Sequence, residues 1–89
     1  MVTVEFAPSL RRHVDCPLQH VSPQALGEAL HAALQAAPTL APYVFDEQGA
    51  VRKHVAVFIN GSLLRKRDEL GQILDAGDRV LVIQALSGG

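Results

Sequence analysis

Residues 2–6 read VTVEF, and in this segment apolar and polar side chains alternate. A period of two is typical of a strand with one buried face, so we predict a first strand here. A second extended stretch is predicted within residues 10–21, returning antiparallel to the first. Pro8-Ser9 is the expected turn between the two.

The segment 22–38, SPQALGEALHAALQAAP, has apolar residues every three or four positions. This spacing places them on one stripe and predicts an amphipathic helix packed on a sheet. Ser22 is the predicted N-cap, Pro23 suits the first helical position, and Pro38 ends the helix. Gly27 is expected where the helix comes close to a strand.

The segment after this helix is predicted to return to extended structure. A short extended piece is expected at residues 43–45, followed by a turn at residues 46–49. Residues 51–59 read VRKHVAVFI, and we predict one long strand over this range.

Two turn signals divide the last part of the chain. Asn60-Gly61 is a preferred pair for a two-residue hairpin, so the chain is expected to return at Leu63-Leu64. The sequence DAGD at residues 75–78 predicts a turn into a last strand from Arg79 to about Ala85.

These elements predict an α+β domain with a mixed sheet of about five strands and one main helix. With 89 residues the chain has room for one domain. We place that domain at residues 1–85 and expect residues 86–89 to form a flexible C-terminal tail.

Strand alternation also predicts an open face of the sheet. If Val57 and Val82 face the helix, then Phe58, Leu81 and Ile83 face the other way. One helix covers one face, so these three side chains would form a contiguous apolar patch if their strands are neighbours. Such patches usually mark a site for a partner. The alternative is that the insert around residues 43–45 buries them.

Charge and composition exclude several classes of function. The formal net charge is -1, and the basic cluster at residues 65–67 runs directly into Asp68-Glu69. No sustained positive field is available for nucleic acid or an anionic membrane, and no apolar run reaches about 18 residues. Cys16 is the single cysteine, which excludes a disulfide framework. We therefore expect a cytoplasmic protein with no nucleic-acid partner and no membrane partner.

Metal and nucleophile sites are not predicted. The four histidines form no HxH or HxxxH pair, and Cys16 is expected to be a packed thiol. The charge run at residues 65–69 is expected to be a solvated loop. A competing interpretation is an acidic rim that meets arginines of a partner; it would consist of Asp68, Glu69, Asp75 and Asp78.

The last residues of the sequence are Leu86, Ser87, Gly88 and Gly89. Glycines have no Cβ, so this end is expected to extend and to be narrow enough for an active-site tunnel. Such a tail suits activation of its carboxylate by ATP as an acyl-adenylate. The alternative is a loose end without a role.

Three motifs in this order resemble the MoaD/ThiS family of sulfur carriers: VAVFING at residues 55–61, DAGDRV at residues 75–80, and the terminal SGG. The resemblance implies the ubiquitin-like β-grasp fold and a carrier that is a substrate, not an enzyme. It also implies that Gly89 is adenylated and thiocarboxylated, behind a tail of Leu86, Ser87 and Gly88. The implied partner-binding patch consists of Phe58, Leu81 and Ile83.

The same resemblance implies the partners. They are a ubiquitin-activating-type adenylating enzyme that uses ATP and Mg²⁺, a sulfurtransferase or sulfur-accepting synthase, and a metalloprotease that trims the carrier. No cofactor or metal is expected on this chain. The insert at residues 43–53 and the ending LVIQALSGG at residues 81–89 resemble carriers that serve the biosynthesis of cysteine or another sulfur metabolite. The alternatives are a small subunit of molybdopterin synthase and a modifier conjugated to lysines.

Overall fold

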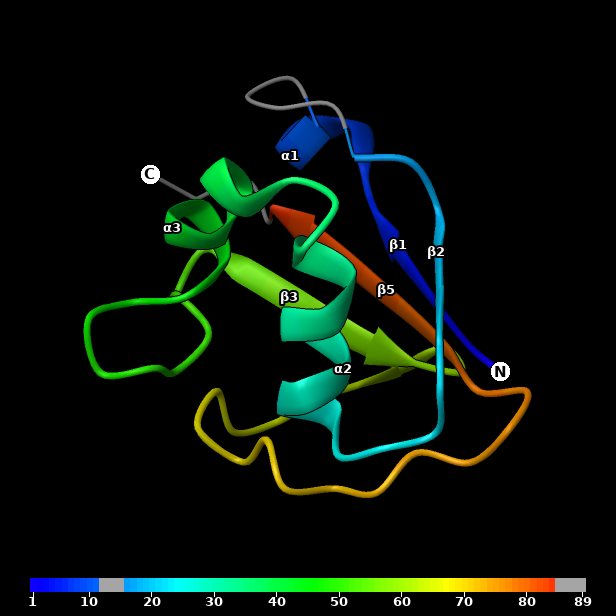
Figure 1. The fold of residues 1–89 in the computed structure, drawn as a ribbon. Coiled ribbons are helices and arrows are strands. Elements are labelled where there is room, and N and C mark those ends of the chain that lie inside the picture. Colours follow the sequence, from blue (N-terminus) through cyan, green and yellow to red (C-terminus); the bar gives the residue numbers. More distant parts are fainter. Residues whose placement is uncertain (12–15, 85–89) are drawn as a thin grey trace.

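A five-stranded sheet forms the centre of the protein (Figure 1). The computed structural model describes residues 1–11 and 16–84. The strand order is β2-β1-β5-β3-β4; β1 and β5 run parallel, and the other neighbours are antiparallel. The predicted mixed sheet is therefore confirmed. Its strands are β1 (Val2–Phe6), β2 (Gln19–Val21), β3 (Val55–Ile59), β4 (Ser62–Leu63) and β5 (Arg79–Gln84).

Helix α2 (Leu26–Leu34) lies across one face of this sheet (Figure 1). Shorter helical segments are α1 (Pro8–Arg11), the 3-10 helix η1 (Pro38–Leu40) and α3 (Ala41–Val44). The apolar stripe of α2 is buried, as the spacing predicts, and so are the alternate residues of the three central strands. Burial of this apolar area is the main stabilising term of the fold. The helix contributes Leu26, Ala29, Leu30, Ala33 and Leu34 to the core, and the strands contribute Val2, Val4, Phe6, Val55, Val57, Ile59, Val80 and Val82.

The predicted start of the main helix is wrong. Helix α2 begins at Leu26, and its N-cap is Ala25, which makes no capping hydrogen bond with its side chain. Backbone carbonyls from a distant segment take that role: the N–H of Leu26 donates to Gln72 O (2.8 Å), and the N–H of Gly27 donates to Leu70 O (2.9 Å). These bonds satisfy orphan donors of the first turn, so Ser22 is not needed as a cap.

Gly27 does mark a close approach, but to a loop and not to a strand. A Cβ built on Gly27 would lie 3.0 Å from the Cβ of Leu70. The small residue therefore lets the segment carrying Leu70 reach the helix N-terminus and cap it.

Two short helices replace predicted turns or strands. Pro8-Ser9 lies in α1 and not in a plain turn. Of the predicted extended residues 43–45, only Phe45 is extended, because α3 continues to Val44. Each of these short helices places one apolar side chain in the core: Leu10 from α1 and Val44 from α3. The backbone remains satisfied in both places, since the N–H of Leu10 donates to Ala7 O and the N–H of Phe45 donates to Ala41 O.

Strand β3 is shorter than predicted and begins at Val55. Val51 forms only an isolated bridge with Phe45, and the N–H of Val55 then donates to Arg52 O (3.0 Å) across a turn. The turn separates the two extended pieces, so residues 51–59 cannot form one ladder.

The glycine turns are placed as predicted. Asn60 and Gly61 have φ angles of 51° and 86°, the left-handed pair that a two-residue hairpin requires, and Gly77 has φ 92°. The return strand is β4, so Leu64 lies just beyond it. Strand β5 is described as far as Gln84, and Ala85 lies outside the described residues. Among the described residues, no helix is long and apolar enough to span a membrane.

Candidate functional site

The predicted apolar patch lies on the sheet face opposite α2. Val57 pairs with Val82, and both are buried beneath the helix. The neighbouring pair, Phe58 and Leu81, therefore points to the other side, and Ile83 follows two residues along the same strand. The predicted alternation and the predicted neighbourhood of the two strands are both confirmed.

The insert does not cover this face. The ring of Phe45 stacks on His31 of α2, with centroids 4.4 Å apart and an interplanar angle of 8°. The insert thus packs on the helix side of the sheet. Leu81 keeps 36% of its surface exposed, and Phe58 and Ile83 are partly exposed. The alternative in which the insert buries the patch is wrong.

Leu63 adds to the patch, although it was not among the residues predicted for it. It lies opposite Phe58 on β4 and is 54% exposed. The position of Leu63 could have been predicted from the hairpin register, because a two-residue turn at Asn60-Gly61 places residue 58 opposite residue 63. We call Phe58, Leu63, Leu81 and Ile83 together the apolar face.

Charged side chains flank the apolar face. Glu5 of β1 pairs with Leu81 in the parallel register, so it continues the row of Leu81, Phe58 and Leu63 across four strands. A depression of about 290 Å³ lies in this region, and Arg79 is part of its lining. An apolar centre with charges at its edge is the usual composition of a protein interface. The depression is lined by Phe58, Asn60, Gly61, Arg79 and Leu81.

Asn60 and Asp78 clamp the hairpin to the start of β5. Asn60 Nδ2 donates to Asp78 Oδ1 (3.0 Å), and the N–H of Arg79 donates to Asn60 Oδ1 (2.9 Å). Asp78 Oδ2 also accepts from the N–H of Asp75 (2.8 Å). These bonds fix one edge of the depression. The hydrogen bond from Asn60, helped by the bond from Asp75, lowers the pKa of the Asp78 carboxyl below its ordinary value of 3.8.

Acid should weaken this Asn60–Asp78 clamp. A carboxyl whose pKa is lower in the folded state stabilises the fold above the unfolded pKa of 3.8, and that contribution is lost as the pH falls through the folded value. We expect the unfolding free energy of the wild type to exceed that of Asp78→Asn at neutral pH, with the difference shrinking on acidification. Urea unfolding between pH ~2 and ~7 measures it.

The matched control for that series is Asp75→Asn. This change removes a neighbouring carboxylate that accepts none of the clamp's hydrogen bonds. A difference between wild type and Asp78→Asn that stays constant with pH would contradict the role of the Asp78 charge.

The other candidate site residues predicted from the sequence do not form one common site. Cys16 is buried, as expected. Glu69, Asp75 and Asp78 line one groove with Ile73, whereas Asp68 does not line it, so the acidic rim forms only in part. Within residues 1–11 and 16–84, no group of three or more metal-binding side chains gathers. The predicted tail and activation site lie outside the described residues; they are Leu86, Ser87, Gly88 and Gly89.

Comparison with known proteins places this arrangement in a family. The sequence model of the ThiS family matches residues 17–89. SAMP1 from Haloferax volcanii is 26% identical, with 99% of this chain and 98% of that chain covered and a TM-score of 0.78. A chain of the Amycolatopsis orientalis BexX/CysO complex is 19% identical, with 100% of both chains covered and a TM-score of 0.81. CysO from Mycobacterium tuberculosis, described as an antigen, is 21% identical, with 97% of this chain and 100% of that chain covered and a TM-score of 0.79.

No curated protein sequence matches the chain. The family match nevertheless spans most of it and includes every residue of the apolar face. The predicted ubiquitin-like β-grasp fold is confirmed by the solved structures. The chain therefore belongs to the ThiS family of ubiquitin-like sulfur carriers.

Proposed function

We propose that this protein carries sulfur as a thiocarboxylate on Gly89. The observation that carries the proposal is the position of the apolar face on β5, the strand that leads directly to the C-terminal residues. A partner that binds Leu81 and Ile83 contacts the chain close to its activated end. The five residues after Gln84 can span at most about 18 Å, so the docked face limits where the Gly89 carboxylate can be.

Activation would follow the chemistry of acyl-adenylates. A Gly89 carboxylate oxygen attacks the α-phosphorus of ATP, and pyrophosphate leaves. The terminal sulfur of a sulfurtransferase persulfide then attacks the carbonyl carbon and displaces AMP, which gives an acyl disulfide. A second thiol attacks the donor's sulfur, forms a disulfide with it and releases the thiocarboxylate. ATP and Mg²⁺ belong to the adenylating enzyme in this scheme, while this chain supplies the substrate carboxylate and the docking face.

The proposed partners follow from that chemistry. A ubiquitin-activating-type enzyme binds the apolar face, and a sulfur-accepting synthase consumes the thiocarboxylate in cytoplasmic biosynthesis of cysteine or another sulfur metabolite. A metalloprotease that trims the carrier to a free Gly89 is a further proposed partner. The partly apolar, charge-edged face supports a protein partner of this kind.

A second function is conjugation to lysines of other proteins. The observation that favours it is the likeness to SAMP1, a small archaeal modifier protein, over nearly the whole of both chains. In that case a lysine amine, not a sulfur nucleophile, attacks the activated Gly89 carbonyl.

Mass spectrometry of the protein from its own host separates the two functions. Intact and C-terminal-peptide spectra under reducing conditions should show one oxygen of Gly89 replaced by sulfur. Oxidation of Met1 or Cys16 changes the mass by nearly the same amount. The mass shift must therefore be localised to the last peptide, and the thiocarboxylate must be trapped with a thiol alkylator. Gly89 joined to lysines of other proteins would favour the modifier, and Gly89 always bare would contradict both functions.

A further inference from the structure

A pocket lined by basic residues lies apart from the apolar face and shares no residue with it. Its volume is about 320 Å³. Three fixed positive charges line it against one carboxylate, in a chain whose formal net charge is -1. We call it the basic pocket; its lining is Asp46, Gln48, Arg52, Lys53, His54 and Arg67.

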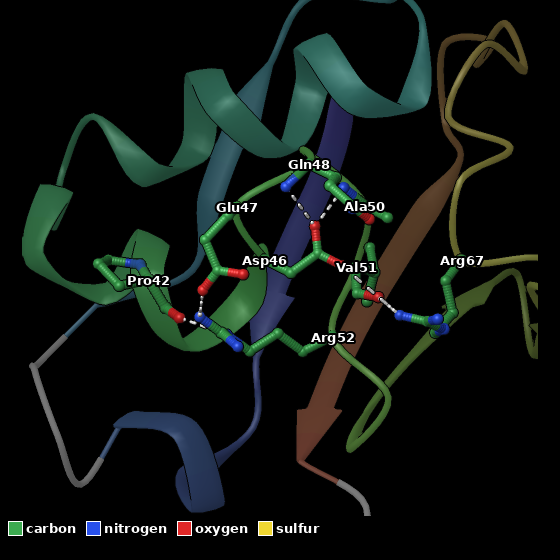
Figure 2. A network of polar contacts seen from close by, with 8 residues as sticks. All are labelled: Pro42, Asp46, Glu47, Gln48, Ala50, Val51, Arg52 and Arg67. Carbon is green, nitrogen blue, oxygen red and sulfur yellow. Dashed lines mark hydrogen bonds and ion pairs between the residues drawn. The ribbon is translucent and has the colours of Figure 1, made fainter.

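The loop that forms one wall of the basic pocket is held in a fixed shape. Asp46 Oδ1 accepts hydrogen bonds from the backbone N–H groups of Gln48 (2.9 Å) and Ala50 (3.0 Å), as Figure 2 shows. At the ends of the loop, Phe45 bridges to Val51, and both side chains are buried in the core. The single carboxylate of the pocket is therefore already engaged in ordering its own loop.

Neutral carbonyl groups orient the two arginines (Figure 2). Arg52 Nε donates to Pro42 O (2.6 Å), and Arg67 Nη1 donates to Val51 O (2.8 Å). Their nearest carboxylate oxygens, on Glu47 and Asp46, are each 3.7 Å away, which is longer than a hydrogen bond. The guanidinium groups are thus positioned without being fully neutralised, and their side chains are 41% and 43% exposed.

Lys53 and His54 complete the pocket from the turn that precedes β3. The hydrogen bond from Val55 N–H to Arg52 O closes this turn and fixes their backbone. In the part of the chain that the structure describes, no hydrogen bond or ion pair engages either side chain. The pocket therefore offers an ammonium and an imidazole beside two preorganised guanidinium groups.

We propose that the basic pocket binds the diphosphate group of a small anion, either free pyrophosphate or a nucleotide diphosphate. Arginine guanidinium groups match phosphate oxygens geometrically as well as electrostatically. A compact anion fits better than a nucleic-acid strand, because negative charge interrupts the positive charge around the pocket: Glu47 pairs with Arg52, and Asp68 lines the neighbouring depression with Arg67. This binding site does not depend on the sulfur-carrier function.

Amide NMR of the isotope-labelled full chain tests the site. Titration with sodium pyrophosphate at constant ionic strength should shift the amides of Gln48, Lys53 and His54 in a saturable way, whereas sodium sulfate should bind more weakly. Lys53→Gln should weaken pyrophosphate binding about tenfold, the loss of one charge-assisted contact. Arg79→Gln removes one positive charge at a position outside the pocket. It should change the affinity for pyrophosphate by less than about twofold.

A parallel titration with ADP identifies the source of the diphosphate. The same amide shifts with ADP would assign the site to nucleotides, and shifts with pyrophosphate alone would assign it to the free anion; both support the site. Absence of saturable binding by either compound would overturn it. Equal weakening by Lys53→Gln and Arg79→Gln would overturn it as well, since only net charge would then matter.

Discussion

Deletion of Gly89 is expected to lower the rate of acyl-adenylate formation by at least about 100-fold and to abolish the thiocarboxylate. The truncated chain still ends in a carboxylate, on Gly88, but that group lies about 3.5 Å short of the reacting position when the apolar face is docked. Misplacement of a reacting atom by as little as about 1 Å can cost 100-fold in rate. ATP–pyrophosphate exchange with the adenylating enzyme of the same organism measures the effect.

The control for this deletion keeps the chain length constant. Ser87→Ala leaves Gly89 in place and should retain exchange within about threefold of wild type, because it removes one hydroxyl and leaves the terminal carboxylate unchanged. Addition of one residue after Gly89 should block exchange until that residue is removed. Normal exchange by the truncated or the extended chain would contradict the proposed role of Gly89 and would favour a non-covalent docking module.

Phe58→Asp is expected to weaken binding of the adenylating enzyme about 100-fold while leaving the fold intact. Phe58 lies in the middle of the apolar face, between Leu81 and Leu63, and a carboxylate there would be desolvated without a partner on docking. Loss of a central aromatic anchor typically costs at least about 2 kcal/mol, and the buried charge adds to this. Isothermal titration calorimetry with the enzyme measures the affinity.

His20→Asp is the matched control for Phe58→Asp. His20 is exposed on β2, at the opposite edge of the sheet from β4, so the change adds a negative charge outside the apolar face. It should bind the enzyme within about threefold of wild type. Equal weakening by both variants would contradict docking through the apolar face. Circular dichroism that shows Phe58→Asp unfolded would place Phe58 in the core instead.

The expected acid sensitivity of the Asn60–Asp78 clamp also affects the edge of the apolar face. The Asn60–Asp78 clamp holds the hairpin against β5, and Asn60, Arg79 and Phe58 share one depression. Weakening the clamp should therefore loosen the edge of the apolar face before the core opens, because local elements unfold at lower free energy than the whole domain.

Local patterns in the sequence determined much of this protein. Alternation over residues 55–59 and 79–84 depends only on the two-residue repeat of a strand, and it predicts which side chains face away from the helix. The left-handed pair Asn60-Gly61 and the turn at Gly77 depend on backbone sterics within a few residues. The position of Phe58, Leu81 and Ile83 on the open face could therefore be predicted from the sequence alone.

Only the tertiary structure decided the features that join distant segments. The cap of α2 comes from residues 70–72, which replace Ser22 because their carbonyl groups reach the helix across Gly27. The basic pocket likewise joins Arg67 to residues 46–54 through the hydrogen bond to Val51 O. Sequence patterns report interactions within a few residues, whereas these contacts form only after the core has brought separate segments together.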